Sequence, residues 1–308
     1  MKIGCAAGTF TYPSYNAPYD DAIKTIGELG FEGIEMIAFS IDDLYNYYTD
    51  KKITEHKKQI DFYGMSVSEF ILYAPLLDDL LAHSRQEKQK AYDIFERGLD
   101  TAAKFATGII NIVSNWPLEL KAPIPYIPSF IHPNVDGVGK FDPKLKMELP
   151  PGFDAPFVWE NYMQSLEHLV GMCERYKIKF ALEGHANVIV GTTDAFLRAA
   201  DRITSPYFTT NFDTAWQLVQ REYLPWSVYK LRDRISHVHL RDGDGLGCYR
   251  MPTGTGIIDF HGFVRALKEI GFDGFLSFEL AGLSDPVRQV GQAKEYMERV
   301  LKAEGIKQ

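Results

Sequence analysis

The sequence predicts an α/β protein whose eight strand–helix units close into a (β/α)8 TIM barrel, with a long insertion after strand 4. Short apolar runs alternate along the chain with segments whose apolar residues recur every 3.6 residues. Strict alternation of this kind implies parallel strands joined by helical crossovers. The length of 308 residues is that of such a barrel, roughly 250 residues, plus one insertion. We therefore expect one domain spanning residues 1–308.

The first half of the chain supplies four of these units. Its strands are short runs of apolar and β-branched residues, and its helices carry an apolar stripe. No glycine-rich turn follows the first strand, where Ala6-Ala7-Gly8-Thr9 stands, and this disfavours a doubly wound open sheet. The expected strands cover residues 2–6, 33–37, 65–71 and 108–113, and the expected helices cover residues 20–29, 41–61, 84–106 and 159–176.

The second half repeats the alternation with shorter connections. Gly30 and Gly271 each follow a helix, at the position where a C-cap favours a positive φ. Asp259 stands where it can cap the helix that follows it. The expected strands cover residues 178–183, 207–212, 235–240 and 275–280, and the expected helices cover residues 193–203, 226–234, 260–270 and 285–303.

One segment interrupts the pattern. Residues 114–158 separate the fourth strand from its helix and contain nine of the sixteen prolines, together with scattered aromatic residues such as Trp116. A loop that leaves the C-terminal end of a barrel strand lies on the catalytic face. The insertion is expected there as an active-site lid, a substrate wall or an oligomer contact, and the sequence leaves these three roles open.

Composition excludes several classes of protein. The chain is 45% apolar, carries a net charge of −8, and has no apolar run long enough to span a membrane. The negative charge disfavours a nucleic-acid partner. Three cysteines without metal-like spacing, and an N-terminus without a signal-like apolar segment, predict a cytoplasmic protein.

Ionisable side chains end four successive strands. Glu183, Asp213, His239 and Glu279 stand at or near the ends of strands five to eight, on the face that alternation directs into the barrel. Carboxylates brought together would repel one another, and a divalent cation would remove that repulsion. Three carboxylates and one imidazole suit Mn²⁺, which we favour, and also Co²⁺, Mg²⁺ or Zn²⁺.

Five motifs resemble the sugar-phosphate isomerase/epimerase superfamily. They are Leu-Glu-Gly-His at 182–185, Asn-Phe-Asp-Thr at 211–214, His-Val-His-Leu-Arg-Asp at 237–242, the run 254–260, and Ser-Phe-Glu-Leu at 277–280. The superfamily comprises xylose-isomerase-like TIM barrels that include D-tagatose 3-epimerase and inosose dehydratase. The resemblance covers the chain apart from residues 114–158. It implies that Glu183, Asp213, His239 and Glu279 bind one divalent metal ion.

At two positions this sequence differs from the epimerases of the superfamily. Trp216 stands where the epimerases carry a histidine, and Gly245 stands where they carry an arginine, for which Arg241 and Arg250 are candidate substitutes. These changes count against a free monosaccharide 3-epimerase. They favour an apolar or stacking wall in the substrate site.

The expected reaction is proton abstraction next to a carbonyl group, with stabilisation of the enediolate. Glu183 and Glu279 would act as base and acid on two faces of a sugar or keto-glycoside, giving epimerisation or isomerisation. With a leaving group in the β position the same site would act as a lyase, for example an inosose-type dehydratase or an eliminative C-glycoside deglycosidase subunit. A non-catalytic metal- or carbohydrate-binding barrel is the third alternative.

The positions of further residues suggest roles for them in catalysis or in substrate binding. His185, two residues after Glu183, is a candidate acid–base group or a solvated loop histidine. Candidate substrate contacts are Trp216, Arg241, Glu69, Trp116 and His237. His237 is alternatively a buried spacer, and Arg241 alternatively forms an ion pair that shapes its loop. The expected partners are a small carbohydrate and further copies of the chain, or a small β-rich subunit in a hetero-oligomer.

Overall fold

Eight parallel strands form a closed barrel in chain order. They are β1 (Lys2–Ala6), β2 (Gly33–Ala38), β3 (Ser66–Leu72), β4 (Ile109–Val113), β5 (Lys179–Glu183), β6 (Phe208–Asp213), β7 (Ile235–Leu240) and β8 (Phe275–Phe278). Each strand pairs in parallel with the next, and β8 pairs with β1 to close the sheet. The structure, a computed structural model, describes residues 1–117, 150–245, 247–248 and 250–306. It confirms the predicted (β/α)8 barrel.

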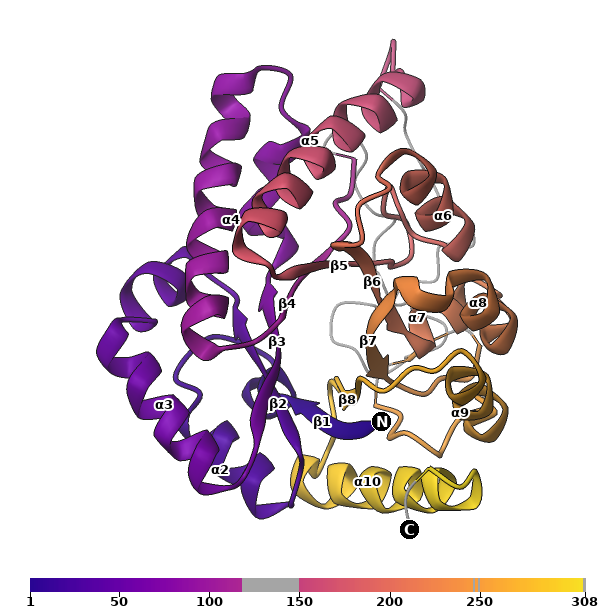
Figure 1. Ribbon diagram of the computed structural model, residues 1–308. Helices are drawn as coiled ribbons and strands as arrows, with labels where there is room; N and C mark the ends of the chain where they lie inside the picture. The colour runs from indigo at the N-terminus through magenta and orange to yellow at the C-terminus, as the bar shows by residue number, and fades with distance from the viewer. Residues whose placement is uncertain (118–149, 246, 249, 307–308) are drawn as a thin grey trace, which may run out of the picture.

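Helices surround the barrel (Figure 1). The longer ones are α2 (Asp20–Glu28), α3 (Asp50–Phe62), α4 (Arg85–Phe105), α5 (Ala155–Tyr176), α6 (Thr193–Arg202), α8 (Leu224–Leu231), α9 (Phe260–Glu269) and α10 (Pro286–Ala303). Short helical segments are α1 (Gly8–Thr11), η1 (Asp43–Tyr47), η2 (Ala74–Leu81), α7 (Thr214–Val219) and η3 (Arg232–Arg234). Across the described residues, no helix has both the length and the apolar character that crossing a membrane requires.

Three helix boundaries differ from the sequence-based expectation. The helix expected at 41–61 is divided, because Thr49 adopts an extended conformation and its side chain caps the start of α3 by accepting a hydrogen bond from the Lys52 amide. The helix expected at 226–234 is α8 followed by η3, and α7 was not expected at all. The α5 helix begins at Ala155, inside the predicted insertion 114–158, because Asp154 caps it. Residues 118–149 of that insertion lie outside the described residues.

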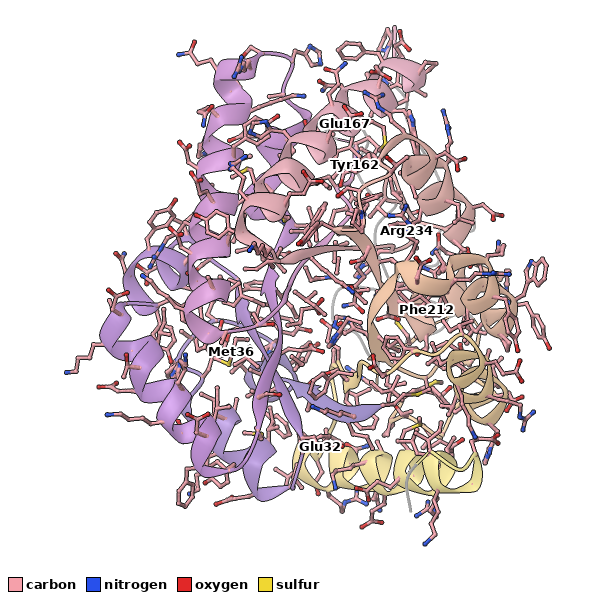
Figure 2. The ribbon with its side chains drawn as sticks, viewed as in Figure 1. Glu32, Met36, Tyr162, Glu167, Phe212 and Arg234 are labelled. Atoms are coloured by element: carbon pink, nitrogen blue, oxygen red, sulfur yellow. The ribbon has the colours of Figure 1, made fainter. Side chains whose placement is uncertain are left out.

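Alternating side chains divide the barrel into an apolar shell and a polar interior. Met36 of β2 and Phe212 of β6 are buried in the hydrophobic core, whereas Glu35, Asn211 and Asp213 of the same two strands belong to a polar set (Figure 2). In α5 the buried Tyr162 hydroxyl accepts a hydrogen bond from the Asn115 amide at 3.1 Å. The helical layer thereby holds the chain where it leaves β4 at the mouth of the barrel.

Two glycines in long helices test how closely the helices pack on the strands. A Cβ atom added at Gly98 of α4 would lie 2.5 Å from Leu72 Cδ1 and 3.2 Å from Ile110 Cδ1, whereas one added at Gly171 of α5 would meet no heavy atom within 4 Å. We expect Gly98→Ala to lower the free energy of unfolding by about 1 kcal/mol or more through overpacking. We expect Gly171→Ala to raise it by about 0.5–1 kcal/mol through helix propensity. Urea unfolding of both variants measures the two effects, and equal shifts would contradict this account of α4 packing.

A buried histidine anchors α3. The side chain of His56 is 0% exposed, and its Nε2 lies 3.1 Å from Tyr47 Oη and 3.6 Å from Asp20 Oδ1. Burial lowers the pKa of His56 to about 4. The unfolded chain therefore binds a proton to this residue at a higher pH than the folded protein does. Its contribution to stability is complete above the ordinary histidine pKa and is lost as the pH falls toward 4.

This linkage predicts a pH-dependent difference between two histidine variants. Between pH 7 and pH 4.5 the wild type should lose about 2 kcal/mol of unfolding free energy that His56→Gln does not lose. His83→Gln, at an exposed position, is the matched control and should follow the wild type. Urea unfolding at several pH values provides the measurement. Parallel pH profiles for wild type and His56→Gln would rule the linkage out.

Candidate active site

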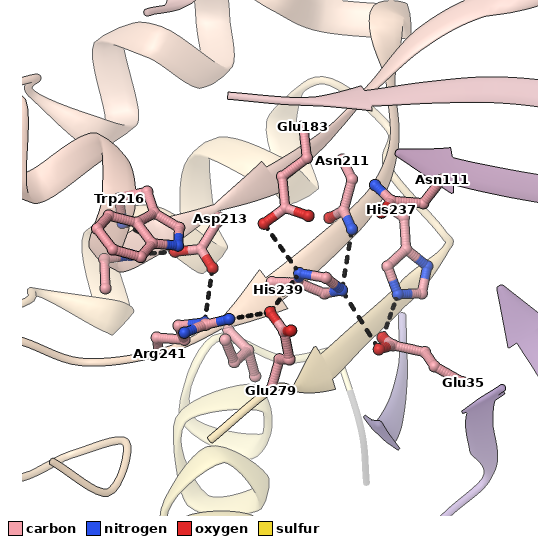
Figure 3. A network of polar contacts seen from close by, with 12 residues as sticks. Glu35, Asn111, Glu183, Asn211, Asp213, Trp216, His237, His239, Arg241 and Glu279 are labelled. Atoms are coloured by element: carbon pink, nitrogen blue, oxygen red, sulfur yellow. Dashed lines mark hydrogen bonds and ion pairs between the residues drawn. The ribbon is translucent and has the colours of Figure 1, made fainter. Parts of the chain in front are cut away.

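Four strand ends bring the predicted metal ligands together. Glu183 ends β5, Asp213 ends β6, His239 lies in β7, and Glu279 follows β8 directly. One donor atom of each side chain lies within 4.8 Å of the others (Figure 3). The strand register explains this convergence, since Asp213 pairs with His239 and His239 pairs with Ser277, two residues before Glu279.

His239 is the centre of the group. Its Nδ1 lies 3.0 Å from Glu279 Oε2 and 3.3 Å from Glu183 Oε1. Burial opposes a charged imidazole, but the neighbouring carboxylates of Glu35, Glu183 and Glu279 together raise the pKa of His239 well above its ordinary value. Burial likewise opposes ionisation of Glu183, yet His239 and His185 hold the pKa of Glu183 well below the ordinary value. The cluster thus balances charges of opposite sign inside the protein.

Asp213 has a structural contact on each of its two oxygens. Oδ1 accepts hydrogen bonds from the amides of Ala215 and Trp216, both at 2.8 Å, and so caps α7. Oδ2 lies 2.8 Å from Nε of Arg241. Burial raises the pKa of Asp213 to about 6, although the Arg241 guanidinium acts in the opposite direction. The same aspartate therefore belongs to the candidate metal site and begins the helix that follows it.

Arg241 joins two of the four candidate ligands. Its guanidinium forms ion pairs with Asp213 and Glu279 (Figure 3). Asp242, the neighbouring residue, instead accepts hydrogen bonds from the amides of Gly254 and Gly256, each at 2.9 Å. The loop after β7 is thus shaped by Asp242 and the glycine backbone, while the side chain of Arg241 belongs to the site.

A second cluster of polar side chains lies in the barrel interior, on the Nε2 side of His239. Nε2 of His239 lies 2.9 Å from Asn211 Nδ2 and 3.3 Å from Glu35 Oε2. His237 Nε2 lies 2.7 Å from Glu35 Oε1, and Asn211 Nδ2 donates to Glu69 Oε2 at 3.0 Å. All of these side chains are buried. Glu69 and His237, which the sequence suggested as substrate contacts, lie in this interior group and do not line the cavity described next.

A cavity of about 400 Å³ opens beside the four candidate ligands. The sequence singled out six of its lining residues, which are Trp116, Glu183, His185, Trp216, Arg241 and Glu279. The ring of His185 lies 4.6 Å from that of Trp216, and its Nε2 lies 2.9 Å from Glu183 Oε1.

Three aromatic residues of the cavity were not foreseen. Tyr15, Phe39 and Tyr73 come from the opposite half of the barrel mouth and line the same cavity. Phe39 and Tyr73 each follow directly the end of a strand, β2 and β3 respectively. An aromatic residue just beyond a strand end was therefore the signal in the sequence that would have identified both.

The donor set fits a divalent cation. Three carboxylates and one imidazole, without a thiolate, are typical ligands of Mn²⁺, Co²⁺, Mg²⁺ or catalytic Zn²⁺. Asp213, Glu183 and His239 are buried and the side chain of Glu279 is 25% exposed, so the group opens to solvent on the Glu279 side. Such an arrangement leaves room for a substrate beside the ligands.

Comparison with known proteins identifies relatives over the whole chain. A family model described as the xylose isomerase-like TIM barrel matches residues 23–300. Fructoselysine 3-epimerase of Escherichia coli O157:H7 is 23% identical over 306 residues, which cover 96% of this chain and 98% of that protein. The structure superposes on the crystal structure of the IOLI protein with a binding zinc atom with a TM-score of 0.72 at 16% identity, over 98% of this chain and 99% of that chain.

Other relatives match over part of their length. An uncharacterised protein of Methanocaldococcus jannaschii is 29% identical over 180 residues, and the match spans 54% of this chain and 60% of that protein. Inosose dehydratase of Clostridium perfringens is 22% identical over 173 residues, which span 48% of this chain and 58% of that protein. The resemblance found in the sequence motifs is confirmed by these matches.

Two substitutions can separate the helix-capping role of Asp213 from the role of its negative charge. Asp213→Asn keeps an Oδ1 acceptor for the α7 amides, whereas Asp213→Ala removes it, and both variants remove the negative charge. We expect the alanine variant to be less stable than the asparagine variant by about 1 kcal/mol, the usual value of an N-cap. Urea unfolding in EDTA measures this difference without a contribution from bound metal. Equal stability of the two variants would show that the cap contributes nothing.

Proposed function

The chain belongs to the xylose isomerase-like TIM barrel family, and on this premise we propose that it is a divalent-metal-dependent epimerase or isomerase of a carbohydrate. The reaction is proton transfer at a carbon next to a carbonyl group. The observation that carries the proposal is the pair Glu183 and Glu279, which approach Nδ1 of His239 from β5 and from the end of β8 at the mouth of the barrel. Fructoselysine 3-epimerase, which matches over nearly the whole chain, supports this class of reaction.

Glu183, Asp213, His239 and Glu279 would hold the metal ion, and we propose Mn²⁺. A divalent ion at this position supplies positive charge for the negative charge that develops on the substrate oxygens. The zinc atom bound by the IOLI protein, which has the same fold, supports a metal in this family of barrels. The cytoplasmic location and the oligomeric assembly expected from the sequence stay predictions.

We assign the two proton-transfer steps of the reaction to the two glutamates. Glu183 is assigned as the proton acceptor because it lines the cavity and its Oε1 lies 2.9 Å from His185 Nε2, a group that can pass the proton on. Glu279, which contacts the same Nδ1 of His239 from the end of β8 and is partly exposed, would return a proton taken up from solvent to the opposite face of the substrate. His185, at 2.9 Å from Glu183 Oε1, would orient that carboxylate and relay its proton.

A lyase reaction at the same site is the second candidate. The partial match to inosose dehydratase favours it, since a proton abstracted next to a carbonyl leads to elimination when a leaving group stands in the β position. The same two glutamates would serve, with Glu279 protonating the leaving group. A barrel that binds carbohydrate without turnover is disfavoured because both proton-transferring groups are present.

Metal binding and proton exchange test the proposal together. The purified protein should bind about one Mn²⁺ per chain, and Glu183→Gln/Glu279→Gln should bind none. In D₂O, the Mn²⁺-loaded wild type should exchange deuterium into candidate ketoses and keto-glycosides, and Glu183→Gln alone should lower this rate at least about 100-fold. Glu28→Gln, on the exposed face of α2, is the charge-matched control and should behave as the wild type.

The products of the deuterium-exchange experiment distinguish the two candidate reactions. Deuterium at C2 or C3 of recovered sugar without elimination supports the epimerase or isomerase, whereas loss of water or of an aglycone supports the lyase. A wild type that binds neither Mn²⁺ nor Co²⁺, and gains no exchange activity with either, would contradict the proposal as a whole.

A further inference from the structure

The cavity beside the candidate metal site has two unlike halves. Residues from β5, β7 and β8 supply its charged groups, which are Glu183, His185, Arg241 and Glu279. Residues at the ends of β2, β3 and β4 supply aliphatic side chains, which are Ile37, Ile71, Leu72 and Val113. Among the described residues, the charged groups that line the cavity therefore lie on one side, and the opposite side is mostly apolar.

Stacked aromatic rings extend the apolar half. The ring of Phe39 lies 3.9 Å from that of Tyr73 with an interplanar angle of 20°, and 5.2 Å from that of Tyr15 with an angle of 29°. Three rings from different βα loops therefore form one continuous wall. Because each ring packs against the next, the wall keeps its shape before a ligand arrives, and little side-chain freedom is lost on binding.

Aromatic side chains also border the polar half. Trp216 is buried, with its ring 4.6 Å from that of His185 and 5.9 Å from the Arg241 guanidinium carbon. Trp116 lies edge-on to His185 at 6.5 Å. Within the part of the chain that the structure describes, a ligand that enters the cavity thus meets aromatic surface on both sides and charged groups at one end.

An unsubstituted monosaccharide fits this division poorly. It carries a hydroxyl on almost every carbon, and hydroxyls buried against an aliphatic wall lose hydrogen bonds to water without replacement. The cavity volume of about 400 Å³ is within the range of pockets that hold larger ligands, roughly 300–1,000 Å³. A ligand with one polar and one flat apolar part would satisfy both halves.

We propose that the substrate is a carbohydrate that carries both a carbonyl group and a flat aromatic group, such as an aryl keto-glycoside. The sugar lies at Glu183 and Glu279, and the aromatic group lies against the wall of Tyr15, Phe39 and Tyr73. This inference rests on the proposed function for the orientation of the sugar end. It adds a subsite for the aromatic group, built from the ends of β2 and β3 and the segment after β1.

Matched pairs of glycosides test the subsite. Calorimetric titration of the Mn²⁺-loaded protein would compare phenyl and methyl β-D-glucopyranosides, galactopyranosides and xylopyranosides. For the sugar that binds best, the phenyl compound should bind at least tenfold more tightly than the methyl compound, with one site per chain. Phe39→Ala and Tyr73→Ala should reduce this preference to about twofold or less. Phe62→Ala, where the ring is 80% exposed on α3, is the control and should keep the full preference.

Binding of Mn²⁺ to every variant is measured in parallel. The aromatic wall contains no candidate metal ligand, so Phe39→Ala and Tyr73→Ala should bind Mn²⁺ as the wild type does, and a folding defect would be recognised by its loss. Three results would overturn the subsite: equal affinity for phenyl and methyl compounds, a preference that survives both substitutions, or no binding of any of the six glycosides. Failure of the proposed function is a separate result, namely absence of Mn²⁺ binding and of deuterium exchange in the wild type.

Discussion

The site depends on a balance of charge around one buried imidazole. His239 lies between Glu183 and Glu279 on its Nδ1 side and between Glu35 and Glu69 on its Nε2 side, in an interior from which water is largely excluded. Buried carboxylates are tolerated only when cations or hydrogen-bond donors compensate them. The imidazole, Arg241 and Asn211 supply that compensation, and a divalent ion bound by His239 would take the place of the imidazole proton, because a histidine ligand is deprotonated. The polar interior of the barrel is organised by this requirement.

The barrel meets this requirement because parallel strands end at the same face. Each strand from β5 to β8 contributes one ionisable side chain at or next to its C-terminal end, and the register of β6 with β7 and of β7 with β8 places these side chains at one level. Asp213 shows how tightly the site and the scaffold are coupled. One of its oxygens caps α7 and the other faces Arg241, so the residue that completes the site also determines where the next helix begins.

The barrel mouth divides into a charged half and an aromatic half. The candidate metal ligands, which include the two groups proposed to transfer protons, come from the ends of β5 to β8, where they are held by contacts in the strand layer. The aromatic wall of Tyr15, Phe39 and Tyr73 comes from loops after β1 to β3, and these residues take no part in the charge balance. Loops can change without disturbing the strand-end cluster.

Local patterns in the sequence determined the eightfold alternation and the four candidate ligands at the strand ends, because strand side chains alternate with period two and Glu183, Asp213, His239 and Glu279 fall on the inward set. The break between η1 and α3 escaped these patterns, since the extended backbone at Thr49 interrupts a stretch in which no glycine or proline marks a boundary. Only the tertiary structure decided that Arg241 pairs with Asp213 and Glu279, and that Phe39 stacks on Tyr73. Those partners are distant in the chain. They meet through the register of a closed barrel, which depends on all eight strands at once and has no local signature.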